Sequence, residues 1–308
     1  MSNNSVSALI AITNGHWLNV LNGLGISING NKHQACPVCG GKDRFRFDDK
    51  GGRGTWFCNQ CEPNSGDGLA LVCNAFGVKP YQAACLVAPL VGLDMGNSID
   101  AERVKRHQQR AAQQQSQSQQ AQQKAREKAA QLAYDIARHC CTEATAANQY
   151  LEVKGVLPFG SLQLNRPVTL PNRQSFKSDT LVIPVFNGAR ISSLQFIAND
   201  GRKTFLAGGQ IKGGMFPLCS QIEATATIYI GEGFATCAAV AEDMPQARVI
   251  CAFNAGGLVE IAKLVRRSRP QANIIMLADN DRSGAGEHYA RLAAIAANGC
   301  YIMPEVCA

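Results

Sequence analysis

Apolar and polar positions alternate along the chain in patterns that divide it into three zones. Residues 7–94 begin with a helical pattern from Ala8 to Leu24, ended by Gly25, and finish with a second helical pattern from Leu69 to Val91. Residues 101–130 are dominated by Gln, Ala, Lys and Arg, with almost no large apolar side chain, so they cannot form a core. We expect this tract to be a linker, either disordered or an exposed helix.

The third zone opens with helical spacing and continues into a β-hairpin. Helices are expected before Gly155, from the apolar residues Leu132, Tyr134, Ile136, Tyr150 and Leu151. Two apolar runs, Thr180–Phe186 and Arg190–Ile197, flank Asn187-Gly188, a dipeptide typical of two-residue hairpin turns. Pro184 predicts that the first strand lies at a sheet edge or carries a bulge, because proline cannot donate to a strand ladder.

Beyond the hairpin, buried strands alternate with helical segments. The expected strands are Thr227–Ile230, Arg248–Ala252, Asn273–Leu277 and Cys300–Met303, with helices between them. Strict alternation of strands and helices predicts a parallel sheet that is covered on both faces.

Composition narrows the class of protein. A length of 308 residues suggests about two domains. The net charge of +7 favours a polyanionic partner. The 13 cysteines include four at metal spacing, and several of the others lie within apolar runs, which is typical of a reducing compartment. No leader pattern and no membrane-spanning apolar stretch is visible, so we expect a cytoplasmic protein that does not engage a membrane.

The paired cysteines predict a structural zinc site. Cys36 and Cys39 form one Cys-x-x-Cys pair, and Cys58 and Cys61 form a second. Two such pairs supply the four thiolates of a closed tetrahedral zinc site. His33, three residues before the first pair, is an alternative ligand. A redox dithiol and four unrelated buried cysteines are the other interpretations.

Cations alternate with aromatic residues between the two cysteine pairs, on an expected β-hairpin. Strand alternation places arginines on one face and phenylalanine rings on the other. We expect Arg44, Arg46 and Trp56 to contact single-stranded nucleic acid, through phosphates and base stacking. The simpler interpretation assigns Phe45, Phe47 and Phe57 to the small core of this segment, and we expect it to hold for two of the three.

Three carboxylates near the end of the chain predict a magnesium site. Glu232 follows the strand Thr227–Ile230, and Asp279 and Asp281 follow the strand Asn273–Leu277. Ligand sites of parallel α/β sheets lie beyond the carboxyl ends of the strands, and Mg²⁺ prefers hard oxygen donors together with substrate phosphates. The alternative is that these carboxylates only cap helices. Zinc and magnesium sites on one basic chain favour an enzyme of nucleic-acid polymerisation.

The same residues resemble a known family. Gly231-Glu-Gly233 with Asp279-Asn-Asp281 resembles the Toprim domain of primases, topoisomerases and related nucleases. Residues 33–68 resemble the zinc-binding domain of the primase-helicases of satellite phages and prophages. The segment from Glu232 to Thr236 is similar to the catalytic signature of that primase family, which commonly has tyrosine where this chain has Phe234. The resemblance covers most of the chain outside the Gln-rich tract.

The resemblance implies a multidomain fold. Residues 1–97 would form a zinc ribbon, a small β-structure with flanking helices that binds the template, and residues 98–130 the linker. Residues 131–222 would form a small α+β subdomain of the primase core. Residues 223–308 would form the α/β Toprim domain with its parallel sheet.

The implied function is that of a DNA-dependent RNA primase, a nucleotidyltransferase. It would synthesise short RNA primers on single-stranded DNA from ribonucleoside triphosphates, in phage, prophage or plasmid replication. Asp279 and Asp281 would hold the catalytic Mg²⁺, with Mn²⁺ as an alternative ion, and Glu232 would be a metal ligand or general base. The candidates for nucleotide contact are Lys203, Lys212 and Arg190, for which solvated surface residues are the alternative.

The sequence also departs from the family. It has no Gly-x-x-x-x-Gly-Lys-Ser/Thr loop, so we expect a replicative helicase to act in trans. The chain is then either a fragment or a short primase. Two other functions stay open: a single-stranded DNA-binding replication-initiation module with an inactive Toprim fold, and a Toprim nuclease.

Overall fold

The structure, a computed structural model, forms two compact units, Met1–Gln120 and Ala121–Ala308. It describes residues 3–30, 32–93, 95, 101–218, 227–246, 248–279 and 284–303. The predicted domain boundaries after residues 97 and 222 lie outside the described residues. Among the described residues, no helix combines enough length and apolarity to cross a membrane.

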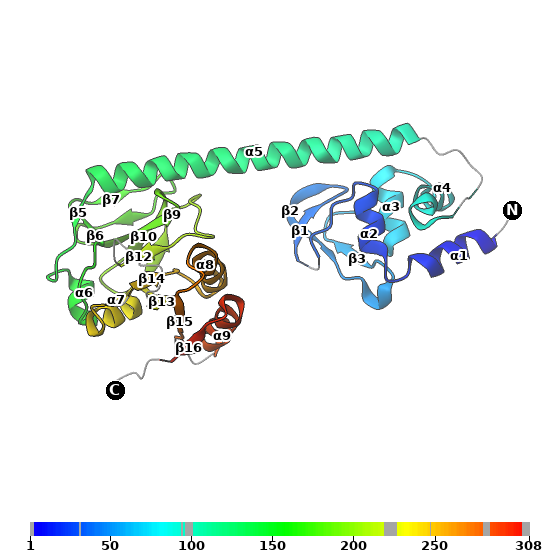
Figure 1. The fold of residues 1–308 in the computed structure, drawn as a ribbon. Helices are drawn as coiled ribbons and strands as arrows, with labels where there is room; N and C mark the ends of the chain where they lie inside the picture. The colour runs from blue at the N-terminus through cyan, green and yellow to red at the C-terminus, as the bar shows by residue number, and fades with distance from the viewer. Residues whose placement is uncertain are drawn as a thin grey trace. The chain divides into compact units, whose positions relative to one another are not determined.

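The first unit is built on an antiparallel sheet with the strand order β1-β2-β3-β4 (Figure 1). The strands are β1 (Gln34–Cys36), β2 (Gly40–Phe47), β3 (Trp56–Cys58) and β4 (Ser65–Gly66). The helical elements are α1 (Asn3–Thr13), α2 (Trp17–Gly23), η1 (Lys50–Gly52), α3 (Gly68–Phe76), α4 (Pro80–Val87) and η2 (Ala88–Val91). One core cluster joins the sheet to the helices and includes Trp17, Leu21, Phe45, Trp56 and Leu71.

The prediction of one helix from Ala8 to Leu24 is wrong, because the chain turns between α1 and α2. Gly15 adopts a φ of 77°, a left-handed conformation that interrupts a helix. Its N–H donates to the carbonyl of Gly52 over 2.7 Å, so the break is held by a contact that is distant in sequence. The predicted end of the helical pattern is confirmed, because α2 ends at Gly23 and Gly25 has a positive φ.

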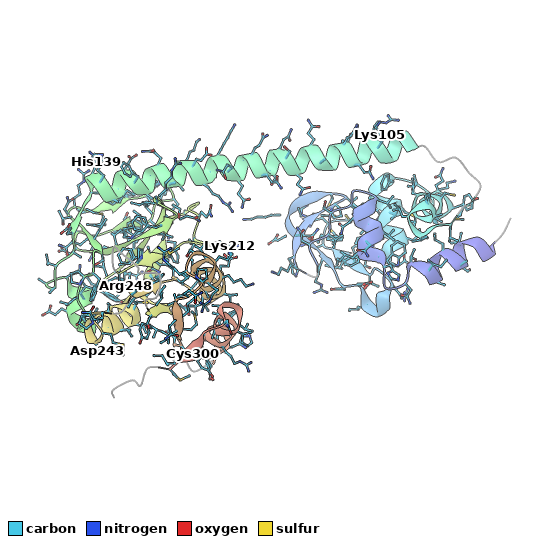
Figure 2. The ribbon with its side chains drawn as sticks, in the orientation of Figure 1. Lys105, His139, Lys212, Asp243, Arg248 and Cys300 are labelled. Carbon is cyan, nitrogen blue, oxygen red and sulfur yellow. The ribbon has the colours of Figure 1, made fainter. Side chains whose placement is uncertain are left out.

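Helix α5 (Ala101–His139) is continuous through the Gln-rich tract, which is therefore the exposed helix and not the disordered alternative. Figure 2 labels Lys105 and His139 near its two ends. In the first unit, the Gln108 side chain donates to the carbonyl of Gly23 over 2.8 Å. In the second unit, Ala133 and Ile136 are buried.

The second unit contains an antiparallel sheet in the order β11-β10-β9-β6-β5. Its strands are β5 (Cys141–Glu143), β6 (Leu162–Leu164), β9 (Leu181–Asn187), β10 (Arg190–Ile197) and β11 (Lys203–Phe205). Helix α6 (Gln149–Lys154) and the small hairpin of β7 (Val168–Thr169) and β8 (Ser175–Phe176) complete this region. The predicted hairpin is confirmed, with Arg190 opposite Asn187.

Pro184 lies on β9, which has neighbours on both sides, so the expected edge strand is not observed. Strand β6 pairs with β9 only at Leu181 and Val182, so Pro184 needs no donor on that side. The expected bulge is present in the β9–β10 pair, but the extra residue, Ser192, belongs to β10.

A second sheet in this unit has the order β12-β14-β13-β15-β16, and β13 to β16 pair in parallel (Figure 1). The strands are β12 (Phe216–Pro217), β13 (Thr227–Gly231), β14 (Arg248–Cys251), β15 (Asn273–Leu277) and β16 (Cys300–Ile302). The helices are α7 (Phe234–Asp243), α8 (Ala255–Ser268) and α9 (Ala285–Ala297). The four predicted strands and their parallel pairing are confirmed.

Both faces of the parallel sheet are covered, as predicted. Ile228, Ile230 and Ile274 pack in one cluster with residues of α8 and α9. Val249 and Leu277 face the opposite side, in a cluster with residues of α7, β9 and β10. The antiparallel sheet of this unit therefore covers the parallel sheet, and this packing brings the segment after β10 close to the end of β13.

Asn148 joins separate segments of the region around the antiparallel sheet, so its loss should destabilise the second unit. It is 3% exposed, its Oδ1 accepts from the N–H groups of Tyr150 and Leu151, and its Nδ2 donates to the carbonyl of Asp179 over 2.8 Å. We expect Asn148→Ala to lower the free energy of unfolding by about 1–3 kcal/mol. Urea denaturation followed by far-ultraviolet circular dichroism measures this.

The matched control is Asn199→Ala, because Asn199 is exposed and donates to an exposed partner, Gln149. It should change stability by less than about 0.5 kcal/mol. Both tryptophans of the chain, Trp17 and Trp56, lie in the first unit, so tryptophan fluorescence should report no change for either variant. A parental circular-dichroism midpoint for Asn148→Ala would contradict the assigned role.

Candidate zinc centre and acidic site

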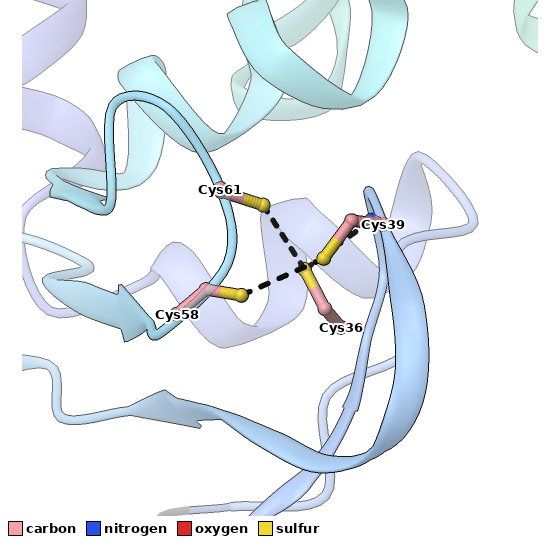
Figure 3. Close-up of side chains that lie close together, drawn as sticks. All are labelled: Cys36, Cys39, Cys58 and Cys61. Atoms are coloured by element: carbon pink, nitrogen blue, oxygen red, sulfur yellow. Dashed lines mark hydrogen bonds between the residues drawn. The ribbon is translucent and has the colours of Figure 1, made fainter.

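The four predicted zinc ligands converge in the first unit (Figure 3). The sulfur atoms of Cys36, Cys39, Cys58 and Cys61 all lie within 4.8 Å of one another. The Cys36–Cys61 and Cys39–Cys58 sulfur pairs are both 3.6 Å apart. A regular tetrahedron with Zn–S bonds of about 2.3 Å has edges of about 3.8 Å, so the four thiols fit a zinc ion.

Local backbone structure presents each cysteine pair on a tight turn, or knuckle. In the first knuckle, the N–H groups of Val38 and Cys39 point at the Cys36 sulfur, at 3.4 and 3.5 Å. Cys36 ends β1 and pairs with Gly40 at the start of β2, so the knuckle is the turn between these strands. Cys58 ends β3 and begins the second knuckle.

The electrostatics of the cluster favour a bound cation. Burial alone would raise the pKa of the Cys58 thiol, but backbone N–H groups of Gln60 and Cys61 stabilise the thiolate and lower its pKa to about 7. Burial and the neighbouring thiols raise the pKa of Cys61. A divalent cation removes this conflict, because it stabilises several adjacent thiolates at once.

His33 does not belong to the metal-binding group that the described residues form, which consists of the four cysteines. Its Nδ1 lies 3.1 Å from the carbonyl oxygen of Asp43, across the β1–β2 pair. The cysteine-only ligand set is therefore the one that the geometry supports, and the histidine alternative is not.

The expected alternation of cations and aromatic rings on β2 is confirmed. Phe45 and Phe47 are buried, whereas Arg44 and Arg46 are half-exposed on the opposite face. Register places Arg46 opposite Phe57 of β3. Phe57 is 40% exposed, so this face of the sheet carries both arginines and an accessible ring.

Trp56 occupies a different position from the one expected of a base-stacking residue. Its side chain is 2% exposed, its ring stacks on Phe45 at 6.0 Å, and its Nε1 donates to the carbonyl of Asp67 over 3.0 Å. The ring therefore belongs to the core, and it is not accessible for stacking on a base. Two of the three phenylalanines were expected in the core: Phe45 and Phe47 are buried there, and Phe57 is the exposed one, on the arginine face.

A groove of about 630 Å³ runs along this face. Its lining includes three cations, one exposed ring and two carboxylates: Arg46, Lys50, Arg53, Phe57, Asp48 and Asp67. Asp48 forms an ion pair with Arg46 over 2.6 Å. The other two cations of this groove, Lys50 and Arg53, form no ion pair with the residues that the structure describes. A groove with cations and an accessible ring suits single-stranded nucleic acid.

In the second unit, the parallel sheet brings the predicted acidic residues to one edge. Gly231 of β13 pairs with Leu277 of β15, and Glu232 and Asp279 follow these residues beyond the carboxyl ends of the strands. Asp281 lies outside the described residues. The helix-cap interpretation does not fit Glu232, because Gly233 is the N-cap of α7.

Neighbouring groups hold this acidic edge in place. The Thr236 hydroxyl, on the first turn of α7, donates to Oδ1 of Asp279 over 3.4 Å. The Cys251 thiol donates to the carbonyl of Glu232 over 3.2 Å. A Cβ at Gly286 would lie 3.1 Å from the Cβ of Asp279, so this glycine allows α9 to approach the site. Thr236 ends the motif that begins at Glu232, but the sequence pattern did not predict its contact with Asp279.

The three predicted nucleotide contacts occupy different places. The Nζ of Lys203 lies 3.7 Å from the position of a Cβ at Gly233, so its ammonium group is beside the Glu232 loop. Lys203 pairs with Ile197 at one end of β10. Arg190 lies at the other end of this strand, roughly 20 Å from Ile197. Lys212, labelled in Figure 2, pairs with Glu260 over 2.9 Å.

Two domain families match this chain. Residues 31–69 match the family described as the zinc-binding domain of primase-helicase, and residues 227–304 match the Toprim domain. The chain therefore combines a primase-type zinc ribbon with a C-terminal Toprim domain.

Particular relatives are DNA primases. Two curated proteins, both DNA primase TraC of Escherichia coli, are 28% identical over 165 residues and 33% identical over 122 residues. These matches include 50% and 36% of this chain, and they span only 11% of the length of each relative.

Solved structures of primases are also similar to this chain, at lower sequence identity than the TraC proteins. The primase fragment of the bacteriophage T7 primase-helicase protein is 13% identical, with a TM-score of 0.40, over 89% of this chain and 90% of that chain. The Aquifex aeolicus primase, with its zinc-binding and RNA polymerase domains, is 12% identical, with a TM-score of 0.34, over 99% of this chain and 80% of that chain. The fold assignment rests on strand order and the two domain matches instead.

The zinc assignment predicts that Cys58→Ser removes the metal and unfolds the ribbon. Cys58 is 0% exposed and belongs to both the cluster and the core, so its loss should affect both. We expect zinc content to fall from one ion per chain to near zero, as measured by plasma emission spectrometry. Tryptophan fluorescence should show loss of the first unit, while the second unit keeps its circular-dichroism transition.

Cys73→Ser is the matched control. Cys73 is half-buried in the same unit and does not belong to the four-thiol cluster. This variant should keep one zinc ion. If Cys58→Ser also kept one ion, the ligand assignment would be refuted.

Proposed function

We propose that this chain is a DNA-dependent RNA primase that makes short RNA primers on single-stranded DNA from ribonucleoside triphosphates. The observation that carries the proposal is the convergence of Glu232, Asp279 and Lys203 at the carboxyl edge of the Toprim sheet. The zinc ribbon on the same chain and the similarity to DNA primase TraC add support. The matches span only 11% of the length of each relative, so the proposal rests on the site residues of this chain and not on the activity of the relatives.

The proposed chemistry assigns one task to each group at the edge. Asp279 and Asp281 would hold Mg²⁺ or Mn²⁺, and the carboxylate of Glu232 would either complete the ligand set or accept the proton of the attacking 3′ hydroxyl. The ion would neutralise triphosphate charge and lower the pKa of that hydroxyl. Lys203 would donate to phosphate oxygens beside Gly233, a residue that has no side chain of its own to obstruct them. Thr236 orients Asp279.

The zinc ribbon is proposed to hold the template. The groove beside Arg46 offers Lys50 and Arg53 to phosphates, and Phe57 offers an exposed ring for stacking. Phe57 replaces Trp56 in this role, because Trp56 is buried. A replicative helicase acting in trans is proposed to deliver single-stranded DNA.

The acidic edge predicts that Asp279→Ala abolishes primer synthesis without weakening DNA binding. Loss of the carboxylate removes a metal ligand, whereas the template is held by the other unit. The zinc-loaded protein is incubated with single-stranded circular DNA, Mg²⁺ and labelled ribonucleotides, and the products are resolved by length. We expect oligoribonucleotides from the parent and at least about 100-fold less from Asp279→Ala.

Asp243→Ala is the control, because Asp243 is exposed at the C-terminal end of α7, whereas α7 begins at the acidic edge (Figure 2). It should prime like the parent. Bound DNA without any labelled product from the parent would favour a binding module. Shortened DNA without added ribonucleotides would favour a nuclease.

The position of Lys203 predicts a defect in nucleotide use. Removal of a charged donor to phosphate costs about 1.5–3 kcal/mol, so Lys203→Ala should raise the KM for ribonucleoside triphosphates by tenfold or more. Lys212→Ala is a matched comparison, because the Lys212 ammonium already pairs with Glu260. It should raise this KM less. An equal increase for both lysines would show that Lys212 also reaches the nucleotide.

A further inference from the structure

The side chain of Arg44 turns back over Gly41, which follows the first zinc knuckle at the start of β2. A Cβ built at Gly41 would collide with the Arg44 side chain, with Cζ at 2.6 Å and Cδ at 2.8 Å. Gly41 is the second residue after Cys39, and it has a φ of 86°. A side chain at position 41 is therefore excluded both by its backbone conformation and by the guanidinium group that lies across it.

The backbone of Arg44 holds the other knuckle. Its carbonyl oxygen accepts from the N–H of Asn59 over 3.2 Å, and Asn59 lies inside the second Cys-x-x-Cys pair, next to Cys58. Arg44 thus contacts Gly41, two residues after Cys39, and Asn59, next to Cys58. These two cysteines have sulfur atoms 3.6 Å apart, so the residue joins two chain segments that must meet around one ion.

The positive charge of Arg44 complements the charge of the zinc centre. Four thiolates and one zinc ion carry a net charge of about −2, which a nearby cation stabilises. Among the described residues, Arg44 has no carboxylate partner, whereas its neighbour Arg46 pairs with Asp48 over 2.6 Å. Arginine keeps its positive charge at every accessible pH, and its planar group can lie flat on the backbone of a glycine.

We propose that Arg44 is a positioning residue of the zinc centre: its guanidinium group lies over Gly41 and stabilises the zinc tetrathiolate, while its carbonyl fixes the second knuckle. Nucleic-acid contact, which the sequence suggests for Arg44, is then left to Arg46 and the groove residues. The inference rests on the zinc ribbon and not on the proposed primase reaction.

The test compares zinc retention in the zinc-loaded full chain. Arg44→Gln removes the charge and keeps a polar side chain of similar reach, and Arg44→Lys keeps the charge. Transfer of zinc to a chromophoric chelator gives the rate of release. Loss of outer groups around metal ligands typically weakens affinity 10- to 100-fold, so we expect release from Arg44→Gln to be about tenfold faster or more. Arg44→Lys should restore part of the difference.

Arg46→Gln is the matched control on the same strand and face, and it should release zinc at the parental rate. Higher salt should narrow the gap between Arg44→Gln and the parent, because salt screens charges at half-exposed sites. A purely steric role would show neither the lysine rescue nor the salt dependence. Parental zinc release from Arg44→Gln would overturn the proposal.

A second variant examines the contact over the glycine. Gly41→Ala should speed zinc release in the parent, both by straining the left-handed backbone and by displacing Arg44. In the Arg44→Gln background only the strain should remain, so the two effects should be less than additive. Full additivity would show that the Arg44 side chain does not act through its contact with Gly41.

Discussion

The parallel pairing of β13 with both β14 and β15 is the constraint on which the acidic site depends. Gly231 lies opposite Cys251 on one side and Leu277 on the other, so the loops after all three strands leave the sheet at one edge. Glycine is required at 231 because a Cβ there would lie 2.7 Å from the Cys237 sulfur. A shift of one residue in this register would turn the buried side chains to the wrong face.

The antiparallel sheet that covers the parallel sheet also positions a cation of the site. Leu181, Ile183 and Ile197 pack in the same cluster as Phe234 and Leu277, and the short strand β11 follows directly from β10. This packing brings Lys203 beside Gly233, although thirty residues separate them in sequence. The cation and the carboxylates of the site thus come from different sheets, held together by one apolar core.

The zinc ribbon combines metal ligation with an ordinary hydrophobic core. Cys36 and Cys58 are buried in the same cluster as Trp17 and Trp56, so the metal ligands are continuous with the apolar interior. Burial, and then the crowding of the neighbouring thiols, raises the pKa of Cys61 and opposes its ionisation. A zinc ion relieves this opposition, which couples metal binding to the stability of the unit.

Much of this organisation could be predicted from local patterns in the sequence. Cysteine spacing identified the zinc ligands, strand–helix alternation predicted the parallel sheet, and Asn187-Gly188 predicted the hairpin. Each of these signals depends on residues close together in the chain. The break at Gly15 was missed because its partner, Gly52, is distant, and the edge assignment of Pro184 failed because strand order is a global property.

The sequence by itself therefore determined the kinds of sites and the residues that chemistry requires in them. Only the tertiary structure decided which aromatic ring is accessible, with Trp56 inside and Phe57 outside, and which lysine reaches the acidic edge. It also decided that the Arg44 side chain lies over Gly41, two residues after the zinc ligand Cys39. These outcomes depend on contacts between segments far apart in the chain, and hydrophobic period and residue spacing carry no information about such contacts.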